Sequence, residues 1–259
     1  MREYEAGIIR TNHYGANTYL IDISCAGIAA DVAPGQFVQV RVSMGSDPFL
    51  RRTFSVCGAD RTHDTVTLLV DVVGPGTELL CSMKRGGSVS VIGPLGRGFD
   101  MDLGGDGQCA LVAGGSGAAP LMFLSERLIS ERSRPVTFMM GAGTADSLGV
   151  ISFLDGRDIT VLTSTDDGSA GFHGLVSELL ENSIAELNPA AVFTCGPRAM
   201  MRAVAHTAEK ASIPCQVSLE ERMACGIGAC LGCAIQKKDG RIVRSCIDGP
   251  VFNADEVDL

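Results

Sequence analysis

The chain has 259 residues, of which 46% are hydrophobic and 20% are charged, and its formal net charge is −9. This balance is typical of a well-packed globular protein and excludes a largely disordered chain. The length exceeds the usual size of one domain, so we expect more than one compact unit. A nucleic-acid surface needs clustered Lys and Arg, and this acidic chain contains no such run, so we expect no nucleic-acid partner.

The N-terminal segment MREYEAGIIRTNHYG is charged and lacks the apolar core of a secretory signal, so we expect a cytoplasmic protein. The longest uncharged stretch, residues 107–125, is about long enough to span a bilayer. It is interrupted by Gly114, Gly115, Gly117 and Pro120. These glycines and the proline predict a buried strand, a tight turn and a helix start, and not a membrane helix.

Short β-rich runs alternate with turns over residues 1–100, which predicts an antiparallel barrel or sandwich. The runs are TYLIDISC, GQFVQVRV, RTFSVCGA, TVTLLVDVVG and SVSVIGPLG. The strong helical pattern in this part begins near Thr77, where the turn sequence GPGT precedes ELLCSMKR.

The pattern changes over residues 101–217, where apolar strand runs alternate with helical segments. The strand runs are CALVAGG, PVTFMMGA, DITVLTST and AAVFTCG, and the predicted helices cover residues 118–132, 174–187 and 197–211. Such alternation predicts a parallel sheet with helices on its faces.

The last part, residues 218–259, contains four cysteines with the spacing Cys225-x4-Cys230-x2-Cys233-x12-Cys246. Three thiolates on one glycine-rich loop and a fourth from a following segment can surround a cluster of two irons and two sulfides. Zinc is the alternative metal, although zinc sites usually combine two close pairs of ligands, and here Cys246 stands alone. A hairpin is predicted between CAIQKK and RIVRSC, with Asp239-Gly240 as its turn.

The other cysteines do not join this pattern and are expected to be small buried hydrophobes. They include Cys25, Cys57, Cys81, Cys109 and Cys215. We assign no chemistry to Glu220 or Glu221, which precede the cysteine loop.

Two strand-to-helix turns in the middle part have the composition of a nucleotide site. The first turn is Gly114-Gly115-Ser116-Gly117, and the second is Cys195-Gly196-Pro197. Each places the free N–H groups of a helix start at the carboxyl edge of a parallel sheet, where pyrophosphates bind. Each turn taken singly is equally compatible with a tight turn that binds nothing.

The barrel part carries a third candidate site. Arg52-Thr53-Phe54-Ser55 lies on a predicted strand, so Arg52 and Phe54 share one face and Ser55 points to the other. Some twenty residues later, Gly76 and Thr77 open the predicted helix and form a second candidate anion site. The alternative interpretation is an exposed arginine with a core phenylalanine.

Taken together, these motifs resemble the ferredoxin reductase superfamily. Residues 52–55 resemble its flavin-binding Arg-x-aromatic-Ser motif, residues 74–77 its second flavin segment, and GGSGAAP and CGPRAMM its two nicotinamide signatures. The stretch SLEERMACGIGACLGC, residues 218–233, resembles the electron-transfer subunits of class 1B dihydroorotate dehydrogenases. This resemblance implies an FAD-binding antiparallel β-barrel over 1–100, an NAD-binding α/β domain over 101–217 and a small 2Fe-2S domain over 218–259.

The resemblance also implies roles for individual residues. Arg52 would pair with the FAD pyrophosphate, Ser55 would lie near the reactive edge of the flavin, and Phe54 would pack against it. Gly76 and Thr77 would offer backbone and hydroxyl donors to the pyrophosphate. Leu69, Val70 and Asp71 align with the middle flavin segment, and only their main chain is expected to contribute, because Asp71 stands where the family often has a basic residue. No residue of this chain is implied as a catalytic acid or base.

The implied activity is that of an oxidoreductase subunit in pyrimidine biosynthesis. Electrons would leave dihydroorotate at an FMN in a separate catalytic subunit, cross a cluster held by the four cysteines, reach FAD and reduce NAD. The complex would be a heterotetramer with two copies of each subunit, and the loop from Cys225 to Cys233 would be exposed in this chain alone and lie at their interface. NAD is preferred over NADP because the loops at 142–146 and 165–167 contain no Arg or Lys for a 2′-phosphate.

Two alternatives remain at this point. One is a related flavin and iron–sulfur reductase subunit that serves a hydrogenase, a sulfite reductase or an electron-bifurcating transhydrogenase. The other is a redox-sensing or structural zinc-binding subunit that retains the fold without turnover.

Overall fold

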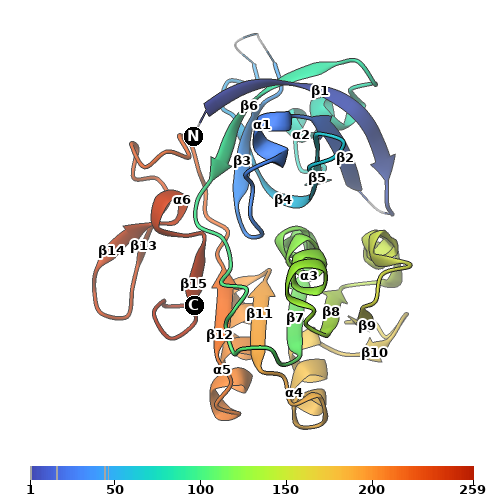
Figure 1. The fold of residues 1–259 in the computed structure, drawn as a ribbon, viewed down its shortest axis with the longest axis vertical. Helices are drawn as coiled ribbons and strands as arrows, with labels where there is room; N and C mark the ends of the chain where they lie inside the picture. The colour runs from blue at the N-terminus through green and yellow to red at the C-terminus, as the bar shows by residue number, and fades with distance from the viewer. Residues whose placement is uncertain (1, 16, 44, 46) are drawn as a thin grey trace.

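The computed structural model describes residues 2–15, 17–43, 45 and 47–259, so that Met1, Ala16, Met44 and Ser46 lie outside the described residues. A β-barrel lies above an α/β sheet, and the C-terminal segment lies beside both (Figure 1). The expected combination of an antiparallel barrel, a parallel sheet and a small C-terminal unit is confirmed.

Six antiparallel strands close into a barrel in the order β1-β2-β5-β4-β3-β6. They are β1 (Arg2–His13), β2 (Thr18–Ser24), β3 (Phe37–Arg41), β4 (Arg52–Asp60), β5 (Thr65–Asp71) and β6 (Ser88–Leu95). Alternate residues of each strand fill the barrel, so Val38, Val40, Phe54 and Val56 share its core. Two short helices accompany the strands, α1 (Ala26–Ala29) and α2 (Pro75–Ser82).

The strand β1 was not predicted from the sequence. Its first half, REYE, is polar and mostly exposed and gives no apolar run. The strand forms because it pairs with β6 and β2 at once and thereby closes the barrel.

The second unit is a seven-stranded sheet with the order β10-β9-β8-β7-β11-β12-β15. Its strands are β7 (Cys109–Gly114), β8 (Val136–Ala142), β9 (Thr160–Thr165), β10 (Phe172–His173), β11 (Ala191–Cys195), β12 (Cys215–Ser218) and β15 (Val251–Asn253). All neighbouring pairs are parallel except β12 with β15. The apolar runs of the central strands are fully buried, as expected for strands covered on both faces.

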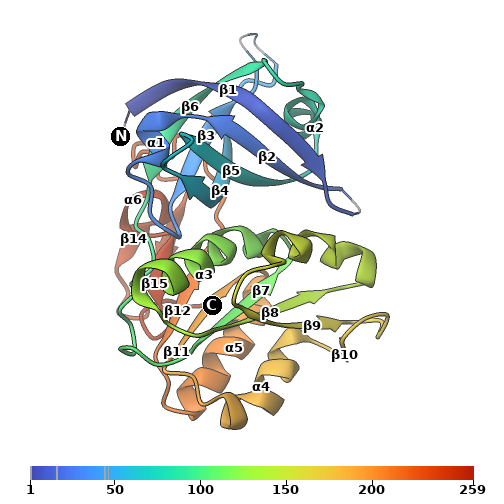
Figure 2. The same cartoon turned by 45° about the vertical axis from the view of Figure 1, so that its right-hand side comes forward.

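Helices cover both faces of this sheet. They are α3 (Ala118–Arg132), α4 (Val176–Leu187) and α5 (Arg198–Lys210), together with the short η1 (Gly115–Gly117) and η2 (Ala145–Leu154). In Figure 2, α3 lies between the barrel and the sheet, and α4 and α5 lie on the opposite face. The three predicted helices of this part are confirmed, as is the strand, turn and helix start within residues 107–125. In the described part of the chain, no helix is long and apolar enough to cross a membrane.

The C-terminal segment is tied to the sheet. The predicted hairpin is present as β13 (Ala234–Gln236) and β14 (Ile242–Arg244), followed by α6 (Ser245–Asp248). The strand β15 then pairs antiparallel with β12. The cysteine-rich segment therefore contributes an edge strand to the seven-stranded sheet, which the sequence pattern did not indicate.

Candidate functional site

A cavity of about 340 Å³ lies where the barrel meets the sheet. Residues from all three predicted flavin segments and from the first glycine turn line this cavity, which we call the flavin cavity. The predicted residues that line it are Arg52, Thr53, Phe54, Ser55, Leu69, Asp71, Thr77 and Ser116. These residues are up to 64 positions apart in the chain, since they extend from Arg52 to Ser116, and the fold brings them to one place.

Arg52 lies directly against the start of α2. A Cβ atom on Gly76 would meet the Arg52 guanidinium, so a larger residue here would displace the arginine side chain from the helix start. The Arg52 guanidinium also donates a hydrogen bond to the carbonyl oxygen of Leu50. The guanidinium and the first N–H groups of α2 thus lie side by side, as a group that binds a pyrophosphate requires.

The hydroxyl of Thr77 makes its hydrogen bonds within its own turn. It donates to the carbonyl oxygen of Gly74 at 2.9 Å and accepts from the N–H groups of Val73 at 3.0 Å and Gly74 at 3.2 Å. Its only hydrogen is therefore used within the turn, and the expected donation from this hydroxyl to a phosphate stays a prediction. Thr77 fixes the turn, and the backbone N–H groups remain as donors.

The middle flavin segment divides between the two faces of β5. Leu69 and Asp71 line the cavity, whereas Val70 is fully buried and points into the barrel core. The carboxylate of Asp71 accepts a hydrogen bond from the Thr18 hydroxyl at 2.6 Å.

The two glycine turns are in direct contact at the carboxyl edge of the sheet, because β7 and β11 are neighbours. A Cβ atom on Gly117 would be 2.3 Å from the carbonyl oxygen of Cys195, and one on Gly196 would be 3.0 Å from the backbone of Gly114. Gly115 has a positive φ of 55°. Side chains at these positions would separate the turns, so glycine is needed for their close approach. Pro197 directly precedes α5 and contacts Gly114, while Ser116 connects the turns to the flavin cavity.

The four cysteines of the C-terminal segment form two neighbouring pairs. The backbone N–H of Cys230 points to Sγ of Cys225 at 3.4 Å. The thiols of Cys233 and Cys246 contact each other in a buried cluster with Phe37 and Leu95. Among the described residues, no group of three or more His, Cys, Asp or Glu side chains surrounds one point as a single ion requires. Two pairs of thiols fit a group of two irons, in which each iron takes two thiolates.

The loop that holds the first pair favours ionised sulfur. Burial opposes ionisation of Cys225, but the N–H groups of Ile227, Cys230 and Ala229 outweigh it and lower the pKa of this thiol to about 7. Burial and the adjacent Cys233 raise the pKa of the Cys246 thiol to about 11. A bound cation reverses the effect of burial, since a coordinating thiol is deprotonated by the metal.

Phe37 forms the wall between the flavin cavity and the cysteines. It lies on the outer face of β3, lines the cavity, and packs against Cys233 and Cys246. The outer face of β3 is buried because the C-terminal segment covers it (Figure 1). No local pattern pointed to this residue, because its contacts are with residues about 200 positions away.

The segment after β12 was also missed. Ser218, Leu219, Glu220, Glu221 and Met223 line the flavin cavity. Burial, followed by repulsion from Asp71, raises the pKa of the Glu220 carboxyl. Glu221 instead forms an ion pair with Arg198 at the start of α5. The position of this segment, directly after a strand that ends at the ligand edge of the sheet, is the signal that could have identified it.

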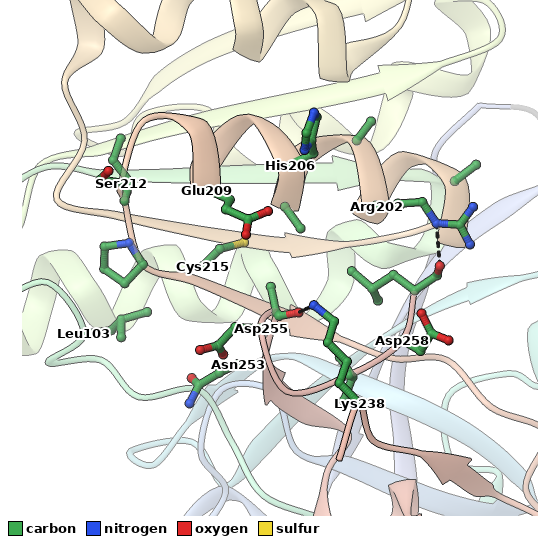
Figure 3. A pocket seen from close by; sticks show the side chains of 18 residues that line it. Leu103, Arg202, His206, Glu209, Ser212, Cys215, Lys238, Asn253, Asp255 and Asp258 are labelled. Atoms are coloured by element: carbon green, nitrogen blue, oxygen red, sulfur yellow. Dashed lines mark hydrogen bonds between the residues drawn. The ribbon is translucent and has the colours of Figure 1, made fainter. Parts of the chain in front are cut away.

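A larger cavity of about 1030 Å³ lies between α5 and the C-terminal segment (Figure 3). None of the predicted site residues lines it. Figure 3 shows Arg202 donating a hydrogen bond to the backbone oxygen of Leu259 and Lys238 donating one to the backbone of residue 254. The Arg202 contact joins the C-terminal segment to α5, whereas the Lys238 contact lies within the C-terminal segment itself.

Two family descriptions match parts of the chain. The description "Oxidoreductase NAD-binding domain" matches residues 111–206, and "Iron-sulfur cluster binding domain of dihydroorotate dehydrogenase B" matches residues 220–258. The second match favours a cluster over zinc as the occupant of the cysteine site.

Solved structures share the fold. An NADH-dependent reduced ferredoxin-NADP oxidoreductase, studied for flavin-based electron bifurcation, has a TM-score of 0.87 and 27% identity, with 98% of this chain and 89% of that chain covered. A ferredoxin NADP+ reductase from Neisseria gonorrhoeae with bound FAD and NADP has a TM-score of 0.60 and 19% identity, with 81% and 92% covered. The second likeness concerns the fold alone.

Curated relatives match nearly the whole chain under a single name, "Dihydroorotate dehydrogenase B (NAD(+)), electron transfer subunit". The protein from Desulforamulus reducens is 40% identical over 252 residues, which cover 96% of this chain and 95% of the relative. The proteins from Listeria monocytogenes serotype 4a and Enterococcus faecalis are 38% and 35% identical, with at least 97% of each chain covered. The chain therefore belongs to the family of dihydroorotate dehydrogenase B electron transfer subunits.

Proposed function

We propose that this chain passes electrons from a partner dihydroorotate dehydrogenase catalytic subunit to NAD, through a 2Fe-2S cluster and FAD, in pyrimidine biosynthesis. The observation that carries the proposal is the adjacency of the three sites. Ser116 belongs to the first glycine turn and lines the flavin cavity, and Phe37 lines the cavity and contacts two of the cysteines. A two-electron site, a converter site and a one-electron site are thus arranged in series.

A flavin bound in the cavity supplies the exchange between hydride transfer and single-electron transfer, which neither NAD nor a cluster can perform alone. The chain's own residues bind and orient it. Arg52 and the backbone N–H groups at Gly76 and Thr77 bind the pyrophosphate. Ser55 and Thr53 provide polar contacts along the outer face of β4, and Phe54 and Leu69 provide apolar contact.

The two glycine turns bind the nicotinamide dinucleotide. Gly114, Gly115, Ser116 and Gly117 allow close approach of its pyrophosphate to the start of α3, and Cys195, Gly196 and Pro197 form the facing turn. The loops after β8 and β9 present Asp146, Asp166 and Asp167 and no basic residue, which supports NAD over NADP. Comparable turnover with NADPH and NADH would contradict this selectivity.

The ligands of the cluster are Cys225, Cys230, Cys233 and Cys246. The loop from Cys225 to Cys233 is largely exposed, and its apolar side chains Ile227 and Leu231 have exposed fractions of 40% and 62%. We assign this surface to the FMN-containing catalytic subunit, because exposed apolar side chains beside a redox centre fit a protein partner that must approach closely. The complex would contain two copies of each subunit in the cytoplasm.

A second candidate is supported by one comparison. The bifurcating oxidoreductase of known structure is similar over 98% of this chain at 27% identity. A role as a flavin subunit of such a transhydrogenase would require ferredoxin and NADP as substrates. The higher identity to dihydroorotate dehydrogenase subunits over the same length favours the first candidate.

The proposal is tested by purifying the chain together with a candidate dihydroorotate dehydrogenase catalytic subunit and measuring dihydroorotate-dependent reduction of NAD. We expect activity from the complex and none from the catalytic subunit alone. NAD reduction by the catalytic subunit without this chain would remove the proposed role, and reduced ferredoxin as the only effective donor would favour the second candidate.

The series arrangement predicts a specific effect of Cys230→Ser. This variant removes one ligand, so we expect loss of the cluster absorption and of dihydroorotate-dependent NAD reduction. NADH-driven reduction of a two-electron dye should survive at least in part, because that reaction needs only the flavin and nicotinamide sites. Loss of both activities in a folded, FAD-loaded variant would contradict the series arrangement, and Cys81→Ser serves as the matched cysteine control.

A further inference from the structure

Gln39 is a buried polar residue on the outer face of β3, two positions from Phe37. Its side chain has no exposed surface. The Nε2 group donates one hydrogen bond to the hydroxyl of Thr53 at 2.8 Å. Thr53 in turn lines the flavin cavity, so the carboxamide is anchored to the flavin side.

The other side of the carboxamide faces the cysteine loop. A Cβ atom on Gly226 would be 2.8 Å from both Cγ and Nε2 of Gln39, and Gly226 has a φ of 66°. The loop therefore turns directly over the carboxamide, at the residue that follows Cys225. Gln39 thus lies between a residue of the flavin cavity and a residue next to a cluster ligand.

The hydrogen bonds of Gln39 are incomplete. Within the described residues, its Oε1 is one of the buried side-chain atoms without a hydrogen-bond partner. Nε2 has two hydrogens and uses one of them for Thr53. A buried amide with unused capacity destabilises a fold compared with an apolar side chain, so packing alone gives no reason for glutamine here.

We propose that Gln39 is a positioning residue for the cluster, which holds the Gly226 turn in place and directs its second N–H toward the sulfur side of the loop. Hydrogen bonds to the sulfurs of a cluster are among the factors that set its potential, and outer residues that orient ligands also determine how firmly the metal is held. Through Thr53, the same carboxamide links the cluster loop to the flavin cavity. The inference rests on the proposed function, in which the four cysteines hold the cluster. The visible spectrum of the unchanged protein tests that assignment separately.

The test compares the FAD- and cluster-loaded chain with two variants, Gln39→Met and Gln39→Glu. Methionine keeps the length of the side chain and removes the amide, and glutamate keeps the shape and removes the N–H donors. We expect both variants to show an altered electron paramagnetic resonance spectrum of the reduced cluster and a lower midpoint potential. Loss of iron to a chelator should become about 10-fold faster or more, and bound FAD should remain.

Gln36→Met is the matched control. The Gln36 side chain accepts from the N–H of Ala33 at 2.9 Å and donates to the carbonyl of Gly96 at 2.8 Å, so its Oε1 and its Nε2 each have a hydrogen-bond partner away from the cysteine loop. This variant should lower the melting temperature and leave the cluster spectrum unchanged. If Gln39→Met leaves the cluster spectrum and potential unchanged, Gln39 only fills space. If Gln39→Glu leaves them unchanged, no N–H donor is needed. Either result overturns the proposal.

If the Gln39 variants do not fold, the Thr53→Val variant tests the proposal instead. It removes only the hydroxyl that anchors the carboxamide. A shifted cluster spectrum in that variant supports the coupling, and an unchanged spectrum overturns it.

Discussion

Arg52 illustrates how much of the flavin site depends on single residues. Its guanidinium lies over Gly76, where a side chain would collide with it, so the positions of the cation and of the helix start are determined together. A charged hydrogen bond contributes about 1.5–3 kcal/mol. We therefore expect Arg52→Ala to weaken FAD binding by about 10- to 150-fold, measured by titrating the flavin-free protein with FAD.

Arg61→Ala is the control for that variant, because Arg61 is an exposed arginine on the turn between β4 and β5. It should bind FAD like the unchanged protein. Equal loss of FAD from both variants would mean that general positive charge, and not the position of Arg52, holds the cofactor.

The raised pKa of the Glu220 carboxyl makes the stability of the fold depend on pH. Burial and Asp71 raise the pKa of this carboxyl, so the folded chain binds its proton more tightly than the unfolded chain, whose value is about 4.3. The stability contributed by this group is present at acid pH and is lost as the pH rises through the raised folded pKa. Glu220→Gln should therefore increase the melting temperature at pH 8, and this increase should disappear below about pH 4.

Glu221→Gln is the matched comparison for Glu220, because its carboxylate pairs with Arg198. It should leave the melting temperature unchanged or lower it at pH 8. An increase for Glu221→Gln equal to that for Glu220→Gln would contradict the environments assigned to the two carboxylates.

At the scale of elements, the contact between the two glycine turns positions the proposed nicotinamide site. A Cβ atom on Gly117 would lie 2.3 Å from the carbonyl oxygen of Cys195. Gly117→Ala should therefore separate the turns after β7 and β11, with a stability loss of about 1–3 kcal/mol. NADH binding, measured by titration, should weaken while the FAD content stays constant.

The control for the turn is Gly7→Ala on β1, where an added Cβ would meet no atom within 4 Å. It should bind NADH normally. Normal NADH binding by Gly117→Ala would place the dinucleotide elsewhere and contradict the proposed role of the turn.

At the scale of the whole molecule, the C-terminal segment and the nucleotide-binding sheet share a core. Phe252 on β15 packs with Met201 of α5, Val217 of β12 and Ile235 of β13. Phe252→Ala should cost about 3–5 kcal/mol. We expect cluster absorption and bound flavin to be lost in one thermal transition at a lower temperature, because the two units are tied by a shared sheet.

Ile242→Ala on β14 is the comparison for Phe252, because Ile242 is 75% exposed. Surface substitutions of this kind change stability by about 0.5 kcal/mol or less. Loss of the cluster from Phe252→Ala well below the temperature at which flavin is released would show that the C-terminal segment unfolds independently.

The sequence by itself determined most of the elements and the donor atoms of each predicted site. Some patterns are local and could be interpreted without the tertiary structure. They are the strand runs of period two, the helices bounded by glycine turns, and the four cysteines of fixed spacing. The helices at 118–132 and 197–211 and the hairpin around Asp239-Gly240 follow from such patterns.

Only the tertiary structure decided which of these local features touch. The closing strand β1, the sheet strand β15 and the cavity residues Phe37 and Glu220 depend on contacts with distant parts of the chain. The same is true of Gln39, which looks like an ordinary strand residue until Thr53 and Gly226 are seen on either side of it. Local propensity encodes the elements and the donor atoms, whereas the proposed arrangement of three redox sites in series depends on packing between segments far apart in the sequence.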